Sequence, residues 1–328
     1  MSAVVAVGLV VLGLVLLAGG GEALVRAAST LAELAGVTPA VIGLTVVAIG
    51  TSLPELVVSL MATLQGQSDL AVANVVGSNI FNVAAALGLT ALIVPLPVHG
   101  AAVRLEWPFM FVASVVCLLL SRDGTLDRLE GGFFVISLAL FIAYTVRLAR
   151  REVGAAEAGE LAAEVESRDI DAPGAERRPP GVLLPLVVLA IGIGALVVGG
   201  RLLVDGAVTL ARLAGLSERV IGLTIVAGGT GAPELATSIV AAIRKRTDVA
   251  VANMIGSNIV NILGILGIAA LASPIRVSPE IVRTDMWWMI GTAVLLLPLL
   301  RSGLRVTRVE GLLLTAAYGV YIGTLLGT

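Results

Sequence analysis

Two stretches of this chain are nearly identical although they lie 179 positions apart, and this repeat limits the possible folds more than any other feature. The first reads VIGLTVVAIGTSLPEL from Val41, and the second reads VIGLTIVAGGTGAPEL from Val220. Another matching pair follows at the same offset, DLAVANVVGSNIFN from Asp69 and DVAVANMIGSNIVN from Asp248. No gap is needed between the stretches, and about half of the aligned positions are identical, which indicates an internal duplication.

The composition places both copies in a membrane. Hydrophobic residues make up 58% of the 328 residues and charged residues only 13%, against roughly 25% charged residues in a typical soluble domain. A chain with so few polar side chains cannot cover its surface for water. The net charge of −2 gives no indication of a nucleic-acid partner. The single Cys117 and the single His99 exclude a disulfide framework and a cysteine–histidine metal cluster.

Apolar runs predict ten membrane-spanning helices, since a bilayer core about 30 Å thick needs roughly 20 apolar residues per helix. They lie near residues 3–33, 38–65, 69–94, 101–121, 127–150, 182–213, 218–243, 248–272, 281–300 and 306–327. A polar stretch of mixed charge, residues 151–181, is predicted to be a linker that is partly helical or disordered. It separates a first five-span repeat (1–150) from a second (182–328).

An odd number of spans in each copy means that the second copy enters the membrane from the opposite side. The predicted fold is therefore an all-α membrane protein of ten transmembrane helices in two inverted five-helix repeats. Basic residues concentrate on the face that carries the linker, so we expect a cytoplasmic linker and external termini. The N-terminal apolar stretch lacks a preceding basic segment and is interpreted as a retained span. We expect a multi-pass protein of the cytoplasmic membrane, and no obligate protein partner is inferred.

Each copy of the motif G-T-x-x-P-E is expected to break its helix. A proline inside a helix removes one backbone hydrogen bond and clashes with the carbonyl group four residues earlier. That earlier residue is a glycine in both copies: Gly50 before Pro54, and Gly229 before Pro233. The breaks should free backbone carbonyls near Ala48 and Ala227, next to the hydroxyls of Thr51 and Thr230 and the carboxylates of Glu55 and Glu234.

These carbonyl, hydroxyl and carboxylate oxygens are hard ligands, suited to Ca²⁺ or Na⁺ rather than to a soft metal. Unwound backbone inside a membrane is tolerated only where it is buried in protein or lines a wet cavity. For one copy, a simple kink with a glutamate that bonds a neighbour would be an equal alternative. Two copies with the acid at the same offset favour a functional site, because ionisable residues inside a membrane are costly.

The second repeated motif is G-S-N-I-x-N. On a helix its serine and last asparagine share a face, as Ser78 does with Asn82, and we expect a site role for Asn82 and Asn261. The other asparagines are interpreted as bonds between helices; they are Asn74, Asn79, Asn253 and Asn258. The motif glycines, Gly77 and Gly256, are expected to allow close approach of helices. Two pairs spaced four residues apart are predicted to be ion pairs, Glu22 with Arg26 and Arg201 with Asp205.

GTSLPE with GSNIFN, repeated as GTGAPE with GSNIVN, resembles the two α-repeats of the sodium/calcium exchanger family, in the cation/calcium exchanger superfamily. The resemblance covers the whole chain and implies a secondary antiporter that exchanges Ca²⁺ for Na⁺ by alternating access, with no cofactor. It implies a central Ca²⁺ site and peripheral Na⁺ sites. The central carboxylates match Glu55 and Glu234, and the family's hydroxyl and backbone ligands match Thr51, Thr230 and the carbonyls of Ala48 and Ala227. The flanking positions match Ser52, Ser78, Ser257, Asn82 and Asn261.

Two departures from the family pattern leave the coupled ion open. Gly231 stands where the first repeat has Ser52, and Asn261 stands where some relatives carry an aspartate. Two carboxylates can balance one Ca²⁺ but leave less charge for several Na⁺, so exchange for H⁺ is the alternative. We predict that Gly231→Ser with Asn261→Asp strengthens Na⁺ dependence. A cation channel is less favoured, because inverted repeats with broken helices are typical of transporters, and no hydrolase constellation is visible.

Overall fold

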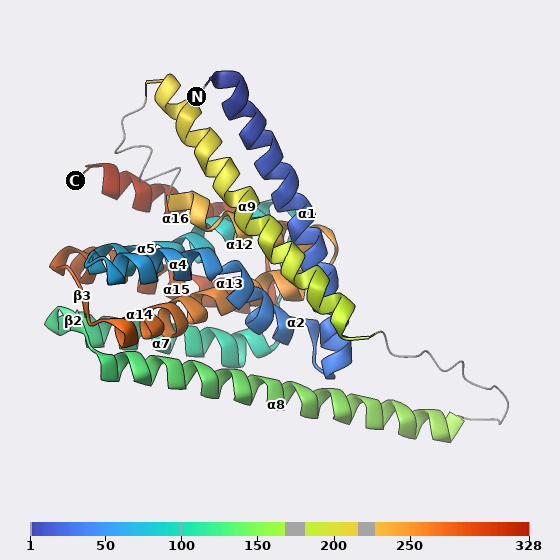
Figure 1. Cartoon of the computed structure of the whole chain (residues 1–328). Coiled ribbons are helices and arrows are strands. Elements are labelled where there is room, and N and C mark those ends of the chain that lie inside the picture. Colours follow the sequence, from blue (N-terminus) through green and yellow to red (C-terminus); the bar gives the residue numbers. More distant parts are fainter. Residues whose placement is uncertain (1, 99, 168–180, 216–226, 328) are drawn as a thin grey trace.

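The structure is a computed structural model that describes residues 2–98, 100–167, 181–215 and 227–327, except the side chains of 152–167, 227 and 326–327. In these ranges α1 (Ala3–Ala35) and α9 (Leu183–Leu213) form a long pair beside a helical bundle (Figure 1). The bundle elements are α2 (Pro39–Ile42), η1 (Gly43–Val47), α3 (Ala48–Thr51), α4 (Leu53–Leu64), α5 (Ser68–Ile80), η2 (Phe81–Ala86), α6 (Leu87–Ile93), η3 (Ala102–Glu106), α7 (Trp107–Leu120), η4 (Ser121–Asp123), α8 (Arg128–Ser167), α11 (Ala227–Thr230), α12 (Ala232–Ile243), α13 (Thr247–Ile259), η6 (Val260–Leu266), α14 (Gly267–Ala272), η7 (Ile281–Asp285), α15 (Met286–Arg301) and α16 (Arg308–Gly327).

Glycines let α1 and α9 approach until their backbones touch. A Cβ atom added at Gly13 would lie 2.8 Å from the carbonyl oxygen of Gly199, and one added at Gly20 would lie 2.9 Å from that of Gly192. The two helices are therefore antiparallel, and no side chain fits between them at these points. Close contact through small residues is how helices gain packing energy in lipid, where the hydrophobic effect does not drive their association.

Two helices with π-helical centres form the buried middle of the bundle. The first runs through α5, η2 and α6, and the second runs through α13, η6 and α14. In both copies the π-helical segment follows the G-S-N-I motif, and such segments are frequent at functional sites. Gly256 packs against η1, because an added Cβ would overlap the carbonyl oxygen of Leu44. Gly77 has no neighbouring atom within 4 Å, so the close approach predicted there is wrong.

Four strands of two residues each connect the two sequence copies. β1 (Leu96–Pro97) pairs antiparallel with β4 (Arg305–Val306), and β2 (Thr125–Leu126) pairs antiparallel with β3 (Ile275–Arg276). Each ribbon thus joins one strand of the first copy to one of the second. The all-α prediction holds for the bundle, and these short ribbons are an addition to it.

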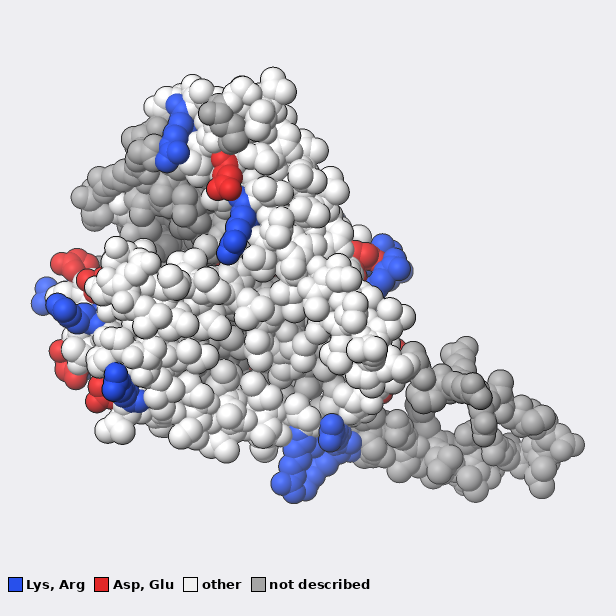
Figure 2. Space-filling view, in the orientation of Figure 1, with Lys and Arg blue, Asp and Glu red and all other residues white. Residues whose placement is uncertain are grey.

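The described residues include six helices that are long and apolar enough to cross a membrane, or seven if the bent pair Pro39–Thr51 and Leu53–Leu64 counts as one span. On the face shown in Figure 2, most charged side chains gather at two opposite ends, and the surface between them is largely uncharged. The chain is therefore an all-helical, multi-pass membrane protein, as predicted. The finer prediction of ten spans is not decided by these lengths.

The fifth predicted span, 127–150, matches the apolar segment Arg128–Arg151, but the helix that contains it is longer. Helix α8 continues from Arg128 to Ser167, past the expected end at residue 150, and Figure 1 shows it extending beyond the bundle. The added segment, REVGAAEAGELAAEVES, is rich in alanine and glutamate, which are strong helix formers. The predicted linker is therefore helical in its first part, while residues 168–180 lie outside the described residues.

Candidate ion-binding site

The first broken helix bends where the motif predicted. The segments on either side of Ser52 are inclined at 46°, and Ser52 itself leaves the helical conformation, with φ −82° and ψ 7°. Pro54 lies at the start of α4, where its missing N–H is least costly. The expectation that the break frees the Ala48 carbonyl is wrong in this conformation. That oxygen accepts a hydrogen bond from the backbone N–H of Ser52 at 3.1 Å.

The second break repeats this geometry at Gly231, with φ −82° and ψ 4°. These angles suit any residue, so backbone conformation does not require a glycine here. Gly229 and Thr230 precede the break in α11, and Pro233 opens α12. Ala227 is the first described residue of this helix, and the residues before it lie outside the described part of the chain.

The two predicted carboxylates meet at the centre of the molecule. Glu55 is 1% exposed and Glu234 is fully buried. The hydroxyl of Ser52 donates a hydrogen bond to Glu234 Oε1 at 3.1 Å, which links the break of one copy to the acid of the other. The Oε2 atoms of both glutamates have no hydrogen-bond partner in the described part of the chain. Each carboxylate therefore has an oxygen available for a cation.

Asparagines from α5, η2, α13 and η6 cross-link the two copies symmetrically. The Asn79 side chain donates to the Asn258 carbonyl oxygen at 3.2 Å, and the Asn258 side chain donates to the Asn79 carbonyl oxygen at 3.3 Å. Asn82 donates to Asn258 Oδ1 at 3.1 Å, and Asn261 donates to Asn79 Oδ1 at 3.0 Å. The predicted bridging role of Asn79 and Asn258 is thus confirmed.

In this arrangement the amide oxygens of two asparagine side chains stay unpaired. The Oδ1 atoms of Asn82 and Asn261 are buried and have no hydrogen-bond partner among the described residues, and neither has the hydroxyl of Ser257. Ser78 is also buried. Buried polar atoms are almost always paired in folded proteins, so several unpaired oxygens in one region indicate a missing ligand.

The motif threonines, Thr51 and Thr230, and the asparagines Asn74 and Asn253 have different neighbours. Thr51 donates to the carbonyl oxygen of Val47 at 3.1 Å within its own helix. Thr230 lines a cavity beside the second break. The predicted structural role of Asn74 and Asn253 is confirmed, because each donates to a serine of the neighbouring helix: Asn74 to Ser59 at 2.9 Å, and Asn253 to Ser238 at 3.1 Å.

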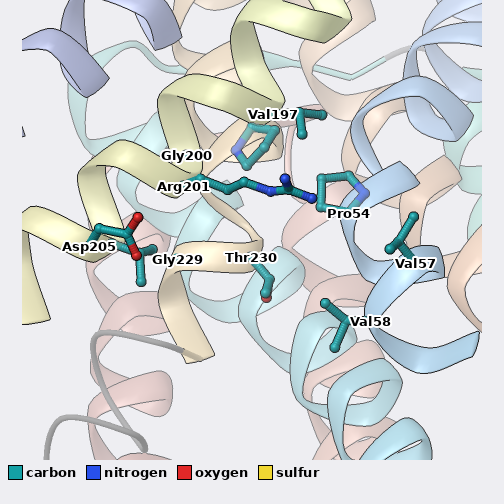
Figure 3. A pocket seen from close by; sticks show the side chains of 11 residues that line it. Pro54, Val57, Val58, Val197, Gly200, Arg201, Asp205, Gly229 and Thr230 are labelled. Atoms are coloured by element: carbon teal, nitrogen blue, oxygen red, sulfur yellow. The ribbon is translucent and has the colours of Figure 1, made fainter. Parts of the chain in front are cut away.

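A cavity of about 160 Å³ reaches both broken helices from the side of α9. Pro54 and Pro233 line it together with Thr230, and Arg201 extends across it toward Pro54 (Figure 3). Asp205 lies away from this guanidinium group in the same view, so the predicted Arg201–Asp205 ion pair does not form. The equivalent pair on α1 is confirmed, since Glu22 bonds Arg26, and Glu22 also bonds Arg244 at 2.6 Å.

Two residues near the carboxylates were not expected from the sequence. Thr237, one helical turn after Glu234, is buried, and its hydroxyl has no partner among the described residues. Its spacing of three residues from the glutamate could have indicated it. Phe81 packs against Gly231, a contact that no sequence pattern predicts.

In the described part of the chain no three acidic, histidine or cysteine side chains form a metal cluster. A cation here would be held by two carboxylates with neutral oxygens.

Comparisons with known proteins agree on one family. A family model described as sodium/calcium exchanger protein matches residues 5–147 and 184–327. The inner membrane protein YrbG of Escherichia coli K12 is 38% identical over 326 residues, covering 98% of this chain and 96% of YrbG. The sodium/calcium exchanger MaX1 of Methanosarcina acetivorans is 32% identical, covering 96% of both chains. A solved structure of the sodium-calcium exchanger NCX_Mj matches with a TM-score of 0.80 and 30% identity, covering 99% of this chain.

Proposed function

The chain belongs to the sodium/calcium exchanger protein family, and from this premise we propose that it is a secondary antiporter exchanging Ca²⁺ for Na⁺ across a membrane. The transported ions are its substrates. The family is one of transporters, so the chain is not expected to act as an enzyme.

One observation carries this proposal: buried, unpaired oxygens from both sequence copies lie on elements that pack together, since α4 contacts η6 and α12 contacts η2. Ca²⁺ takes six to eight oxygen ligands, commonly carboxylates, amide carbonyls, backbone carbonyls and water. Two carboxylates balance the charge of one Ca²⁺. Among the buried oxygens without a partner in the described part of the chain, those of the two repeated motifs are Glu55 Oε2, Glu234 Oε2, Asn82 Oδ1, Asn261 Oδ1 and Ser257 Oγ.

The remaining ligands would come from groups that are now hydrogen-bonded or lie beside the breaks. Carbonyl and hydroxyl oxygens have two lone pairs, so a group that makes one hydrogen bond can still bind a cation. This includes the Ala48 carbonyl and the hydroxyls of Thr51 and Ser52. In the second copy we assign the same role to Thr230 and the Ala227 carbonyl, and we assign a peripheral role to Ser78. The bends at Gly50–Pro54 and Gly229–Pro233 bring these groups together.

The proposed topology is ten spans in two inverted repeats, 1–150 and 182–328, in the cytoplasmic membrane. The 151–181 linker would be cytoplasmic and both termini external. The separate matches of the family model to the two halves support this division. So does the matched spacing of η3 and η7, which begin at Ala102 and Ile281. Cysteine-accessibility labelling of tags tests it, and a terminus found inside would contradict the orientation.

Uptake of ⁴⁵Ca²⁺ into proteoliposomes tests the function. We expect uptake when the vesicles are loaded with Na⁺ and the outside is free of Na⁺. Glu55→Gln and Glu234→Gln should each abolish it while the protein still inserts, because each removes half of the charge that balances Ca²⁺. Near-normal flux in either variant would mean that the central site lies elsewhere.

The same vesicles distinguish Na⁺ from H⁺ as the coupled ion. A pH gradient without Na⁺ should drive little Ca²⁺ uptake if Na⁺ is the counter-ion. Uptake driven only by the pH gradient would replace Na⁺ coupling with H⁺ coupling. Ca²⁺ uptake that proceeds without a Na⁺ gradient and without a pH gradient would not be coupled to a counter-ion, and would indicate a channel.

A further inference from the structure

The ring of Phe81 occupies the space where a side chain at position 231 would lie. A Cβ atom added to Gly231 would be 2.5 Å from both Cδ1 and Cε1 of this ring. The ring also lies along the preceding turn, since an added Cβ at Gly228 would be 3.7 Å from Cε2. Real Cβ atoms do not approach other carbons to 2.5 Å, so a serine at 231 requires Phe81 to move.

The equivalent residues on the other side of the repeat are reversed in size. Ser52 is the first-copy equivalent of Gly231, and Val260 is the second-copy equivalent of Phe81. The Ser52 hydroxyl bonds Glu234. The second break offers no such hydroxyl and meets an aromatic ring instead. The two sides of the candidate site therefore differ: one presents an oxygen ligand and the other a hydrocarbon surface.

The ring lies beside the second break, where it offers hydrocarbon in place of an oxygen ligand, and it is packed against a second aromatic ring. Phe81 is 7% exposed and packs edge to face with Tyr318, at 5.7 Å between ring centroids. The next residue, Asn82, is fixed by its hydrogen bond to Asn258. A movement of the ring would therefore give up its packing against Tyr318.

We propose that Phe81 determines ion specificity by closing the second-repeat side of the site to a monovalent cation. Ca²⁺ keeps both carboxylates, whereas one position for Na⁺ loses its hydroxyl ligand and its space. This inference rests on the proposed function. It also bears on the predicted double change Gly231→Ser with Asn261→Asp, because its serine would collide with the ring unless Phe81 moved.

The sequence repeat suggests the test, since Ser52 and Val260 are the equivalents of Gly231 and Phe81. Phe81→Val with Gly231→Ser copies that pair into the other side of the site. The half-saturating Na⁺ concentration for Ca²⁺ efflux should fall, by about fivefold if the new ligand contributes as much as one ordinary hydrogen bond. The dependence on Na⁺ should also become steeper. Phe81→Val with Gly231→Ala is the matched control, which opens the same space without adding a hydroxyl.

Exchange of ⁴⁵Ca²⁺ for unlabelled Ca²⁺ in the absence of Na⁺ separates this inference from the proposed function. If the serine variant keeps this exchange but its Na⁺ curve matches that of the alanine control, Phe81 does not set Na⁺ binding. If the parent lacks this exchange, the proposed function itself fails. Should the serine variant not fold, the mirror change Ser52→Gly with Val260→Phe must weaken Na⁺ dependence. An unchanged Na⁺ curve there would equally overturn the inference.

Discussion

Replacing Asn79 by alanine should weaken both the fold and the ion site. The side chain makes two bonds to asparagines of the other repeat, donating to the Asn258 carbonyl at 3.2 Å and accepting from Asn261 at 3.0 Å, besides a weak contact with the Met289 sulfur. Hydrogen bonds between membrane helices contribute about 0.6 kcal/mol on average and up to about 1.7 kcal/mol. Asn79→Ala should therefore lower the free energy of unfolding by roughly 1–3 kcal/mol.

The effect on Ca²⁺ follows from the same geometry. Asn261 would lose the acceptor that orients its amide group, so its unpaired Oδ1 would no longer point in a fixed direction. Thermal unfolding in detergent measures stability, and ⁴⁵Ca²⁺ binding to the purified protein measures affinity. Both should fall. By symmetry, Asn258→Ala should give a loss of similar size, because it removes the bond from Asn82.

Ser114→Ala is a suitable control. Ser114 is buried, but its hydroxyl bonds the Met110 carbonyl within the same helix at 2.9 Å, so the change breaks no contact between repeats. It should leave Ca²⁺ affinity unchanged. The reasoning would be refuted if Asn79→Ala bound Ca²⁺ as tightly as the parent and unfolded at the same temperature.

Three other changes test separate parts of the structure. Gly20→Ala should destabilise the protein by about 1–3 kcal/mol through overpacking against Gly192, whereas Gly19→Ala, which has no neighbour within 4 Å, should have little effect in the same unfolding assay. Glu22→Gln removes the partly exposed bonds to Arg26 and Arg244 and should cost no more than about 1 kcal/mol; the loss should disappear in concentrated choline chloride, and a loss insensitive to salt would contradict an electrostatic origin. Tyr321→Phe removes the hydroxyl that donates to Asp285 at 3.2 Å and should lower the unfolding temperature by an amount matching about 1 kcal/mol, with an unchanged temperature showing that this bond is not stabilising.

Much of the helical arrangement could be predicted because lipid imposes simple rules. The span predicted at 69–94 is observed from Ser68 to Ile93, and that predicted at 248–272 begins at Thr247 and ends at Ala272. Charged or polar residues and prolines mark these ends clearly in the sequence. The span predicted at 127–150 is observed from Arg128 to Arg151. Hydropathy alone could not show how far α8 continues into the linker, because its polar extension owes its helix to high helix propensity.

The candidate site was predicted in its residue types but not in its pairing. Repetition of the two motifs indicated Glu55, Glu234, Asn82 and Asn261, and these residues are buried together with unpaired oxygens. The sequence could not show that Asn261 donates to Asn79, because that bond depends on how two distant helices cross. It also could not show that the Ala48 carbonyl stays paired, since the bend falls at Ser52 and spares that hydrogen bond.

The contact of Phe81 with Gly231 was inaccessible for the same reason. Each residue looked like an ordinary variation within its own motif. Only the packing of η2 against the turn between α11 and α12 shows that the large residue and the absent side chain belong together. A departure from a motif can thus be one half of a compensated pair rather than a lost ligand.

The two short ribbons have a consequence for how the halves find each other. Each one pairs a strand of one repeat with a strand of the other, Leu96–Pro97 with Arg305–Val306 and Thr125–Leu126 with Ile275–Arg276. Both ribbons are held by backbone hydrogen bonds, so they can form without the covalent connection between the two halves. Two polypeptides divided at the connector and co-expressed should therefore complement each other and co-purify as one transporter. The same pairing rule would let a single half dock with an oppositely oriented copy of itself, as an ancestor preceding gene duplication would have required.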